Sequence, residues 1–466
     1  MDHTRAKIEY SKQVRIVGLK ILHFLLTVGI FSVFWVLFRY GKLIHGNNFR
    51  YTYFVVIGYG VILFFFHRTY NTYLLGYNRV RECIFAQALA QFFTVLIIYC
   101  SVSIAWNKWN SPWVFIPMFA LQLILDVAWS TIATYCYFKL FPRKNTILVY
   151  RNKLDRNRLG NIKGQPSDRL YRITKELMFD GRFDELRDQL KGYDAIFVAG
   201  VNSQCRNGIL KYCKEEGISG FFLPHVGDVI MQEAMHIQSF DSPVLYIQRS
   251  QPKPEYRIIK RTFDLLVSGL GIVILSPLML ITALAIHFYD GGPAIYKQVR
   301  LTRDGKEFKI LKFRSMRVDA EKDGIAKLSS GDKDERITPI GRIVRKCRLD
   351  ELPQLINIFM GDMSVVGPRP ERPEIAAQYY ESIPDFKLRL QVKAGLTGYA
   401  QVYGKYNTDP YEKLEFDLLY INHMSVLTDL RLIFATFSIL FASESTEGIE
   451  AGQTTAMGDP EADERK

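Results

Sequence analysis

The six cysteines of this 466-residue chain follow no pattern that would indicate a disulfide framework or a zinc site. No two of them form a CxxC pair, and Cys100 and Cys136 lie inside long apolar runs, so reduced thiols are the simplest interpretation. Although the net charge is +13, the chain has no zinc-finger, basic-zipper or RNA-recognition signature, and we expect no nucleic-acid partner. The first apolar run lacks a small-residue cleavage site, which argues against a cleavable signal peptide.

Hydrophobic residues, by contrast, are abundant and make up 48% of the chain. Combined with the positive net charge, this composition is typical of a membrane protein with a basic cytoplasmic face. Because 466 residues exceed what one compact core usually organises, we expect two or three structural units.

Four apolar runs predict a four-helix transmembrane bundle over residues 1–140. The third run carries no charge and is long enough, at about 1.5 Å per residue, to cross roughly 30 Å of hydrocarbon. The fourth contains Asp126, an acid that we expect to face a neighbouring helix. Most of the flanking basic residues place both ends of the bundle in the cytoplasm, and the link between the first two runs is the exception. The four runs are Ile21–Phe38, Tyr51–Phe66, Ile84–Trp106 and Trp113–Phe138.

Residues 141–250 alternate strands and helices in the manner of a small parallel α/β domain. The stretches "NTILVY", "YDAIFVAG" and "GFFLP" predict short strands, and "NGILKYCKEEG" predicts a helix that ends at glycine. After the first strand the chain reads "RNKLDRNRLG" in place of the GxGxxG loop that binds a dinucleotide. We therefore expect a Rossmann-like domain without a cofactor, in a structural or regulatory role.

A further apolar segment, residues 260–288, carries Pro277 near its middle. A proline there removes a backbone hydrogen bond and kinks a helix, and the Ser276 hydroxyl can replace part of the missing hydrogen bonding. The residues alone leave two alternatives open. Either a kinked helix crosses the membrane, or a re-entrant helix over 262–288 dips into one leaflet and returns, so that both flanks stay in the cytoplasm.

The region from 289 to 442 combines an acidic pair, Asp350 and Glu351, with many basic side chains. Any such run of charge is more often a solvated, salt-bridged surface. Here, however, strand alternation places Lys312 and Arg314 on one side, a proline-stiffened loop adds two arginines, and a glycine turn offers backbone amides to an anion. Together the basic groups indicate a site for a multiply charged phosphate ligand. They are Lys312, Arg314, Arg345, Arg348, Arg369, Arg372 and Lys393.

Seven stretches occur in a characteristic order: "KRTFD", the "SP" of the apolar segment, "KFRSM", "RLDELPQL", "GDMSVVGPRPE", "KAGLTGYAQV" and "FDLLYI". With them, residues 256–442 resemble the catalytic domain of the bacterial polyprenyl-phosphate sugar-1-phosphate transferases, the monotopic phosphoglycosyl transferase superfamily. The bundle and the α/β domain are similar to the long form of this family, which initiates exopolysaccharide, capsule or O-antigen repeat units. The resemblance favours the re-entrant helix and implies a catalytic domain over 251–442. The polar, acidic residues 443–466 are expected to be a disordered tail.

The resemblance implies that Asp350 is the nucleophile that attacks the β-phosphate of a UDP-hexose, with glucose or galactose as the sugar. UMP leaves, and undecaprenyl phosphate then accepts the hexose phosphate. Glu351 would organise a metal or handle protons, and both carboxylates are the expected Mg²⁺ ligands. Asp417 in "EFDLLY" is a weaker substrate-binding candidate, for which a helix-surface acid is an equal alternative.

The same resemblance implies a multi-pass protein of the bacterial cytoplasmic membrane whose catalytic domain faces the cytoplasm and contacts membrane lipids. A homodimer through the α/β domain is possible, and later glycosyltransferases of the same pathway are expected partners. Two other classes remain as alternatives: a membrane-anchored sensor or receptor, and a nucleotide-sugar-modifying enzyme. The first predicts no catalytic constellation, and the second requires the glycine-rich cofactor loop that is missing.

Overall fold

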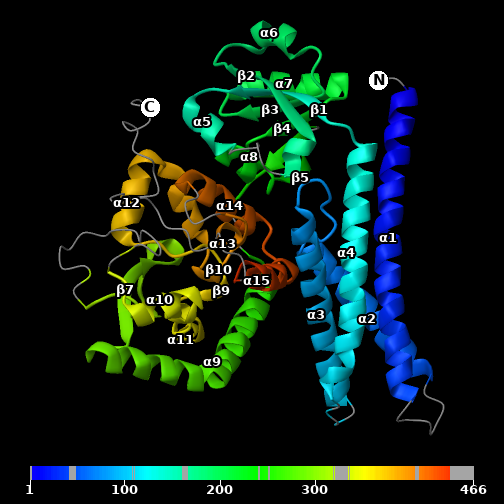
Figure 1. The fold of residues 1–466 in the computed structure, drawn as a ribbon. Helices are drawn as coiled ribbons and strands as arrows, with labels where there is room; N and C mark the ends of the chain where they lie inside the picture. Colours follow the sequence, from blue (N-terminus) through cyan, green and yellow to red (C-terminus); the bar gives the residue numbers. More distant parts are fainter. Residues whose placement is uncertain are drawn as a thin grey trace. The chain divides into compact units, whose positions relative to one another are not determined.

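A computed structural model of the chain describes residues 3–440 apart from 41–48, 106, 108, 110, 160–165, 240–241, 250–251, 319, 321–333, 335 and 405–408. The tail predicted at 443–466 lies outside the described residues. The chain forms two compact units, which divide between Leu223 and Pro224. The first four long apolar helices and a four-stranded parallel sheet belong to the first unit. The acidic pair belongs to the second unit (Figure 1).

The first unit begins with four long apolar helices, each long and apolar enough to cross a membrane. In the bundle α1 packs against α2 and α4, and α3 packs against α2 and α4. Large apolar side chains on their outer faces are exposed, as a hydrocarbon environment requires. The four helices predicted from the apolar runs are therefore present, and they are α1 (His3–Tyr40), α2 (Phe49–Thr69), α3 (Val80–Ala105) and α4 (Phe115–Leu140).

Polar side chains meet inside this bundle. Asp126 of α4 is fully buried, and its Oδ1 atom lies 3.0 Å from His23 Nε2 of α1. The amide of Gln91 on α3 donates a hydrogen bond of 3.0 Å to the same oxygen. Since an uncompensated polar group is costly in an apolar interior, these contacts favour one packing register of three helices. The expectation that Asp126 faces a neighbouring helix is confirmed.

A four-stranded parallel sheet with strand order β2-β1-β3-β4 completes the first unit. The three predicted strands are present, and β2, whose residues alternate between exposed and half-buried, escaped the sequence analysis. The predicted helix α7 ends where Gly217 adopts φ +67°. The elements are β1 (Lys144–Tyr150), α5 (Lys153–Arg158), β2 (Tyr171–Met178), α6 (Phe183–Leu186), β3 (Ala195–Ala199), α7 (Ser203–Glu216) and β4 (Ser219–Phe222), with short 3-10 turns η2 (Pro166–Arg169) and η3 (Arg187–Leu190).

The second unit starts earlier than the sequence suggests. Helix α8 (Val226–Met231) lies in the stretch assigned to the Rossmann-like domain, yet Val226 and Val229 belong to the core of the second unit. Asn422 donates a 2.6 Å hydrogen bond to the Val229 carbonyl, which ties α8 to the far end of the chain. A hairpin of β5 (Met235–Ser239) and β6 (Ser242–Tyr246) follows.

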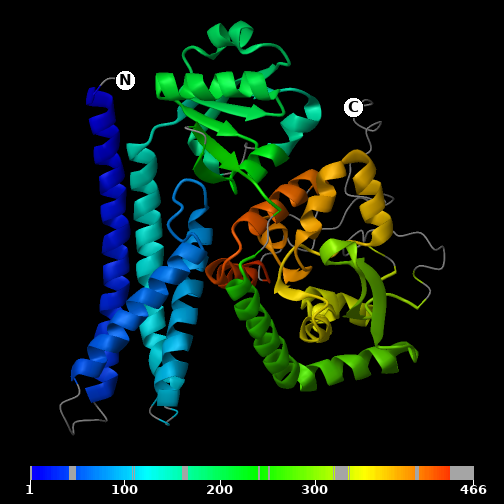
Figure 2. The ribbon, with the colours of Figure 1, turned by 180° about the vertical axis from the view of Figure 1, so that it is seen from behind.

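Helix α9 (Pro254–Asp290) contains Pro277 and bends into two arms, which Figure 2 shows from behind. Pro277 has no N–H to donate to the carbonyl of Val273, four residues earlier. The Ser276 hydroxyl donates a 2.8 Å hydrogen bond to that carbonyl instead. This backbone oxygen is therefore satisfied at the bend, as an apolar environment would require.

The remaining elements of the second unit are short and pack around one apolar core. An antiparallel pair, β7 with β8, and a parallel pair, β9 with β10, are surrounded by helices. In order they are β7 (Ile295–Leu301), η4 (Arg303–Gly305), β8 (Glu307–Phe313), α10 (Pro339–Lys346), η6 (Leu349–Glu351), α11 (Gln354–Met360), β9 (Ser364–Val366), α12 (Pro373–Ser382), η7 (Pro384–Gln391), β10 (Gly395–Thr397), α13 (Tyr399–Tyr403), α14 (Pro410–Asn422) and α15 (Val426–Leu440).

Candidate active site

The acidic pair lies in η6, a single 3-10 turn between α10 and α11. Arg348, directly before this turn, has φ +52°, a left-handed conformation that is uncommon for residues other than glycine. It redirects the chain out of α10, and Pro353 separates the pair from α11. Asp350 and Glu351 therefore lie one turn ahead of the apolar helix.

Glu351 is surrounded by cations. Arg369 Nη2 donates a 2.8 Å hydrogen bond to Glu351 Oε1, and Lys312 Nζ lies 3.5 Å from the same oxygen. Burial by itself would raise the pKa of Glu351, but the charges of Arg369 and Lys312 outweigh it and lower that pKa well below its usual range. Burial in turn lowers the pKa of Lys312 to about 8, although Glu351 opposes this shift. Glu351 is thus ionised at neutral pH and holds two cations together.

Asp350 has the opposite electrostatic character. Burial and then the negative charge of Glu351 raise its pKa to about 6, against the opposing effects of Lys312 and Arg345. A pKa of about 6 leaves roughly nine tenths of Asp350 ionised at pH 7. Two adjacent carboxylates with pKa values on opposite sides of the usual value are typical of an acid pair with divided roles.

Two further arginines, which the sequence analysis missed, bind backbone carbonyls of the loop that carries Arg369. Arg389 Nη2 donates a 2.8 Å hydrogen bond to the Arg369 carbonyl, and Arg300 Nη1 donates one of 3.0 Å to the Pro370 carbonyl. Both arginines stand between apolar residues in the sequence, which is the local sign that Arg389 is buried and Arg300 half-buried. They order the backbone from which Arg369 reaches Glu351.

Asp417 belongs to this supporting layer. Its side chain is only 1% exposed and accepts a 2.8 Å hydrogen bond from Arg389 Nε. Neither a substrate-facing role nor a place on the helix surface fits this burial. Asp417 instead balances the charge of Arg389, which also lies 3.7 Å from Glu371.

Arg314 does not join Lys312, although strand alternation placed them on one side. Strand β8 ends at Phe313, so Arg314 lies beyond the last residue to which that alternation applies. Its backbone N–H donates to the Ala294 carbonyl, and its guanidinium forms an ion pair with Asp290 at the end of α9. Arg314 is therefore a buried anchor for α9.

The other predicted basic residues divide between the pair and its surroundings. Arg345 lowers the pKa of Asp350 and donates a 2.8 Å hydrogen bond to Ser315 Oγ, and Arg348 lowers the pKa of Glu351. Arg372 lies at the start of α12 near Arg300, whose pKa is lowered to about 10 by burial first and, less strongly, by the charges of Arg369 and Arg372.

Lys393 has a different position from the one expected. Its Nζ donates a 2.6 Å hydrogen bond to the Gly361 carbonyl, directly after α11. Burial and the charge of Arg261 lower its pKa. Lys393 thus satisfies a carbonyl at the end of α11, a position where a cation is favourable.

Asp350 and Glu351 also fit the expected Mg²⁺. No cluster of three or more His, Cys, Asp or Glu side chains with metal-binding geometry occurs among the described residues. Mg²⁺ nevertheless commonly binds one or two carboxylates and takes its remaining ligands from water and substrate phosphates. Neighbouring carboxylates beside phosphate-binding cations match that donor set.

Comparison with known proteins agrees with this geometry. Residues 255–443 match the model of the family described as Bacterial sugar transferase. The chain is 38% identical over 200 residues to "Exopolysaccharide production protein PSS" of Rhizobium leguminosarum bv. phaseoli, an alignment that covers 41% of this chain and 97% of that protein.

Two longer relatives carry names that specify a substrate. The "UDP-glucose:undecaprenyl-phosphate glucose-1-phosphate transferase" of Klebsiella pneumoniae is 40% identical over 211 residues, covering 44% of this chain and 43% of the relative. The "Undecaprenyl-phosphate galactose phosphotransferase" of Salmonella typhimurium is 36% identical over 218 residues, covering 44% and 45%. The chain thus aligns with less than half the length of these two relatives.

Proposed function

Because this chain belongs to the bacterial sugar transferase family, we propose that it transfers hexose 1-phosphate from a UDP-hexose to undecaprenyl phosphate. The sugar is glucose or galactose, the two hexoses in the names of the Klebsiella and Salmonella relatives. The observation that carries the proposal is the half-buried pair Asp350 and Glu351, with Arg369 at 2.8 Å and Lys312 at 3.5 Å from Glu351.

The transfer proceeds in two displacements at the same phosphorus. A carboxylate oxygen of Asp350 attacks the β-phosphorus of the UDP-hexose, and the bond from that phosphorus to the bridging oxygen breaks. UMP leaves with the bridging oxygen, and a hexose-phosphoryl aspartate remains. A phosphate oxygen of undecaprenyl phosphate then attacks this phosphorus, which breaks its bond to Asp350 and regenerates the carboxylate.

The surrounding residues make the first attack possible. A carboxylate that approaches a negatively charged diphosphate is repelled by it, so the phosphate oxygens have to be neutralised. Glu351 holds Lys312 and Arg369 beside Asp350 for this purpose, and the planar guanidinium of Arg369 suits paired phosphate oxygens. Bound to the two carboxylates, a Mg²⁺ ion would add further neutralisation of the diphosphate.

The long bent helix α9 supports a re-entrant membrane anchor for the catalytic unit. Its apolar residues are mostly exposed, its bend contains Pro277, and the carbonyl left without a helical donor is satisfied by Ser276. We place both ends of α9 in the cytoplasm, together with the active site. The Rossmann-like sheet of the first unit has a structural or regulatory role. The product enters exopolysaccharide, capsule or O-antigen synthesis.

Incubation with UDP-hexose in the absence of lipid acceptor tests the mechanism. We expect UMP release of about one equivalent per enzyme and a hexose-phosphate adduct that mass spectrometry maps to Asp350. Asp350→Asn should give neither, whereas Glu374→Gln, which removes an exposed acid of α12, should behave like the parent. UMP release that strictly requires the lipid, with no adduct, would mean direct attack by the lipid phosphate. A panel of UDP-sugars in the same assay identifies the hexose, and a receptor would release no UMP.

A further inference from the structure

Strand β9 links the membrane helix α9 to the loop that carries Arg369. The strand has three residues, Ser364–Val366, and the loop begins immediately after it. All three strand residues are nearly fully buried. Any displacement of β9 therefore moves the backbone three residues before Arg369.

Among the described residues, one edge of β9 is paired with a strand, β10. The Ser364 N–H donates a 2.9 Å hydrogen bond to the Ala394 carbonyl beside β10. Because successive N–H groups of a strand point in opposite directions, the Val365 N–H points away from β10. An unpaired buried N–H would be costly.

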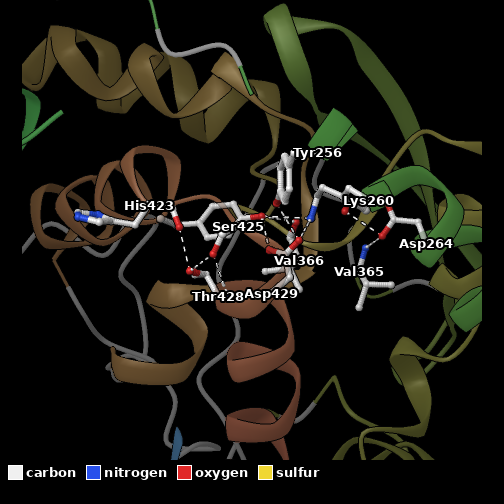
Figure 3. Close-up of polar contacts among 11 residues, drawn as sticks. Tyr256, Lys260, Asp264, Val365, Val366, His423, Ser425, Thr428 and Asp429 are labelled. Atoms are coloured by element: carbon white, nitrogen blue, oxygen red, sulfur yellow. Dashed lines mark hydrogen bonds and ion pairs between the residues drawn. The ribbon is translucent and has the colours of Figure 1, made fainter. Parts of the chain in front are cut away.

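Asp264 of α9 satisfies this edge. Its Oδ1 atom accepts hydrogen bonds from the Val365 N–H at 3.0 Å and from the Ser364 hydroxyl at 3.1 Å. The side chain is 4% exposed, and no charged residue separates it from Asp290 at the far end of the helix. The carboxylate thus takes the place of a neighbouring strand, at the start of the stretch of α9 that carries no acidic or basic side chain other than His287 before Asp290. Figure 3 shows the contact.

One turn earlier, a second contact fixes the same part of α9. Lys260 Nζ lies 2.8 Å from Asp429 Oδ2, and the Tyr256 hydroxyl donates a 2.8 Å hydrogen bond to that oxygen (Figure 3). The hydroxyl of Tyr420 lies 2.9 Å from Asp429 Oδ1 and 3.2 Å from the Val366 carbonyl. Hydrogen bonds therefore connect both ends of β9 to α9, directly through Asp264 and indirectly through Asp429.

We propose that Asp264 is a positioning residue that couples the position of membrane helix α9 to the Arg369–Glu351 contact. The proposal rests on the proposed function, because Arg369 acts there on the diphosphate. In this arrangement the catalytic loop is in register with the acidic pair only while the part of α9 that carries Asp264 keeps its position against β9. Asp264 acts through Arg369 and does not touch the substrate.

A set of variants at position 264 tests the coupling in full-length protein in membranes. Asp264→Ala removes the acceptor, and the rate of adduct formation on Asp350 should fall about tenfold or more. Asp264→Asn keeps an oxygen in place, so its rate should stay within about threefold of the parent. Ser268→Ala is the matched control, since its hydroxyl contacts only carbonyls of α9 itself among the described residues.

A double-mutant cycle with Arg369→Lys separates positioning from general destabilisation. If Asp264 acts through Arg369, then Asp264→Ala should cost less than about threefold in the Arg369→Lys background. A purely structural role would give the same loss in both backgrounds, together with equal falls in the melting temperature, and would overturn the proposal.

If Asp264→Ala does not fold, the variant Ser364→Ala tests the coupling in its place. It removes one of the two hydrogen bonds to Asp264, so we expect a loss of about three- to fivefold in the parent and none with Arg369→Lys. A loss that persists with Arg369→Lys contradicts the coupling. Failure of the proposed function looks different, because the parent itself would then form no adduct on Asp350.

Discussion

The first half-reaction should slow as the pH falls through about 6. Burial and the charge of Glu351 raise the pKa of Asp350 to about 6, and the attacking species is the carboxylate. Protonation on the acid side therefore removes the nucleophile. The ionised fraction is about 0.9 at pH 7 and about 0.1 at pH 5, which predicts a loss of about tenfold in rate between them.

A second limb should appear on the alkaline side. The pKa of Lys312 is lowered to about 8 by burial, so this cation loses its proton as the pH rises through about 8. The diphosphate then loses one of its neutralising charges, and the profile becomes bell-shaped. Lys312→Arg should move the alkaline limb beyond about pH 10, because a guanidinium stays charged there.

Glu351→Gln supplies the decisive variant for the acid limb. Removal of the neighbouring negative charge takes away one of the two causes that raise the pKa of Asp350, while burial remains. The acid limb should therefore move to lower pH, whatever happens to the maximal rate. Glu374→Gln also removes one negative charge, but from the exposed first turn of α12, and should leave the profile unchanged.

The assay is rapid-quench single turnover of UDP-hexose by excess enzyme, without lipid, from about pH 5 to about pH 9. At subsaturating concentrations the second-order rate constant reports the pKa values of the free enzyme, and omission of the lipid removes the titration of its own phosphate. Melting temperatures across the same range control for unfolding. A flat profile, or an acid limb that stays in place in Glu351→Gln, would refute the electrostatic assignment of the pair.

Three further predictions concern recognition, topology and stability. Arg369→Lys keeps the charge but loses the planar fork, so kcat/KM should fall more than tenfold, about 1.4 kcal/mol, and full activity would show that only diffuse charge matters. Single cysteines introduced at 255, in the first turn of α9, and at 305, beyond its end, should both be protected from an impermeant thiol reagent in intact cells; labelling of the second alone would mean that α9 crosses the membrane. Asp417→Asn leaves Arg389 buried without its closest carboxylate, which should destabilise the catalytic unit by about 3 kcal/mol and lower its melting temperature; an unchanged melting temperature would contradict the buried ion pair.

Features that depend on neighbouring residues along the chain were predictable. The four membrane helices followed from apolar runs, because the length of a run and its hydropathy are local properties. Pro277 indicated the bend of α9 for the same reason, since a proline removes a hydrogen bond four residues away in its own helix. The acidic pair and the basic residues directly before it, Arg345 and Arg348, also stood out as charges in one short stretch of sequence.

Packing across long sequence distances decided the rest. Lys312 and Arg314 are two residues apart, yet one meets Glu351 and the other meets Asp290, because β8 ends between them. Val226 belongs to the second unit because the residues that it packs with in the core come much later in the sequence. No local pattern specifies such partners.

The sequence by itself determined which segments are helical and apolar, and which short stretches carry the charged groups of the site. Only the tertiary structure decided which charges meet at the acidic pair and which are paired elsewhere in a supporting role, as Asp417 is with Arg389, 28 residues away. The physical reason is that an ion pair is set by distances in space and by burial, and both arise only when remote segments pack into one core.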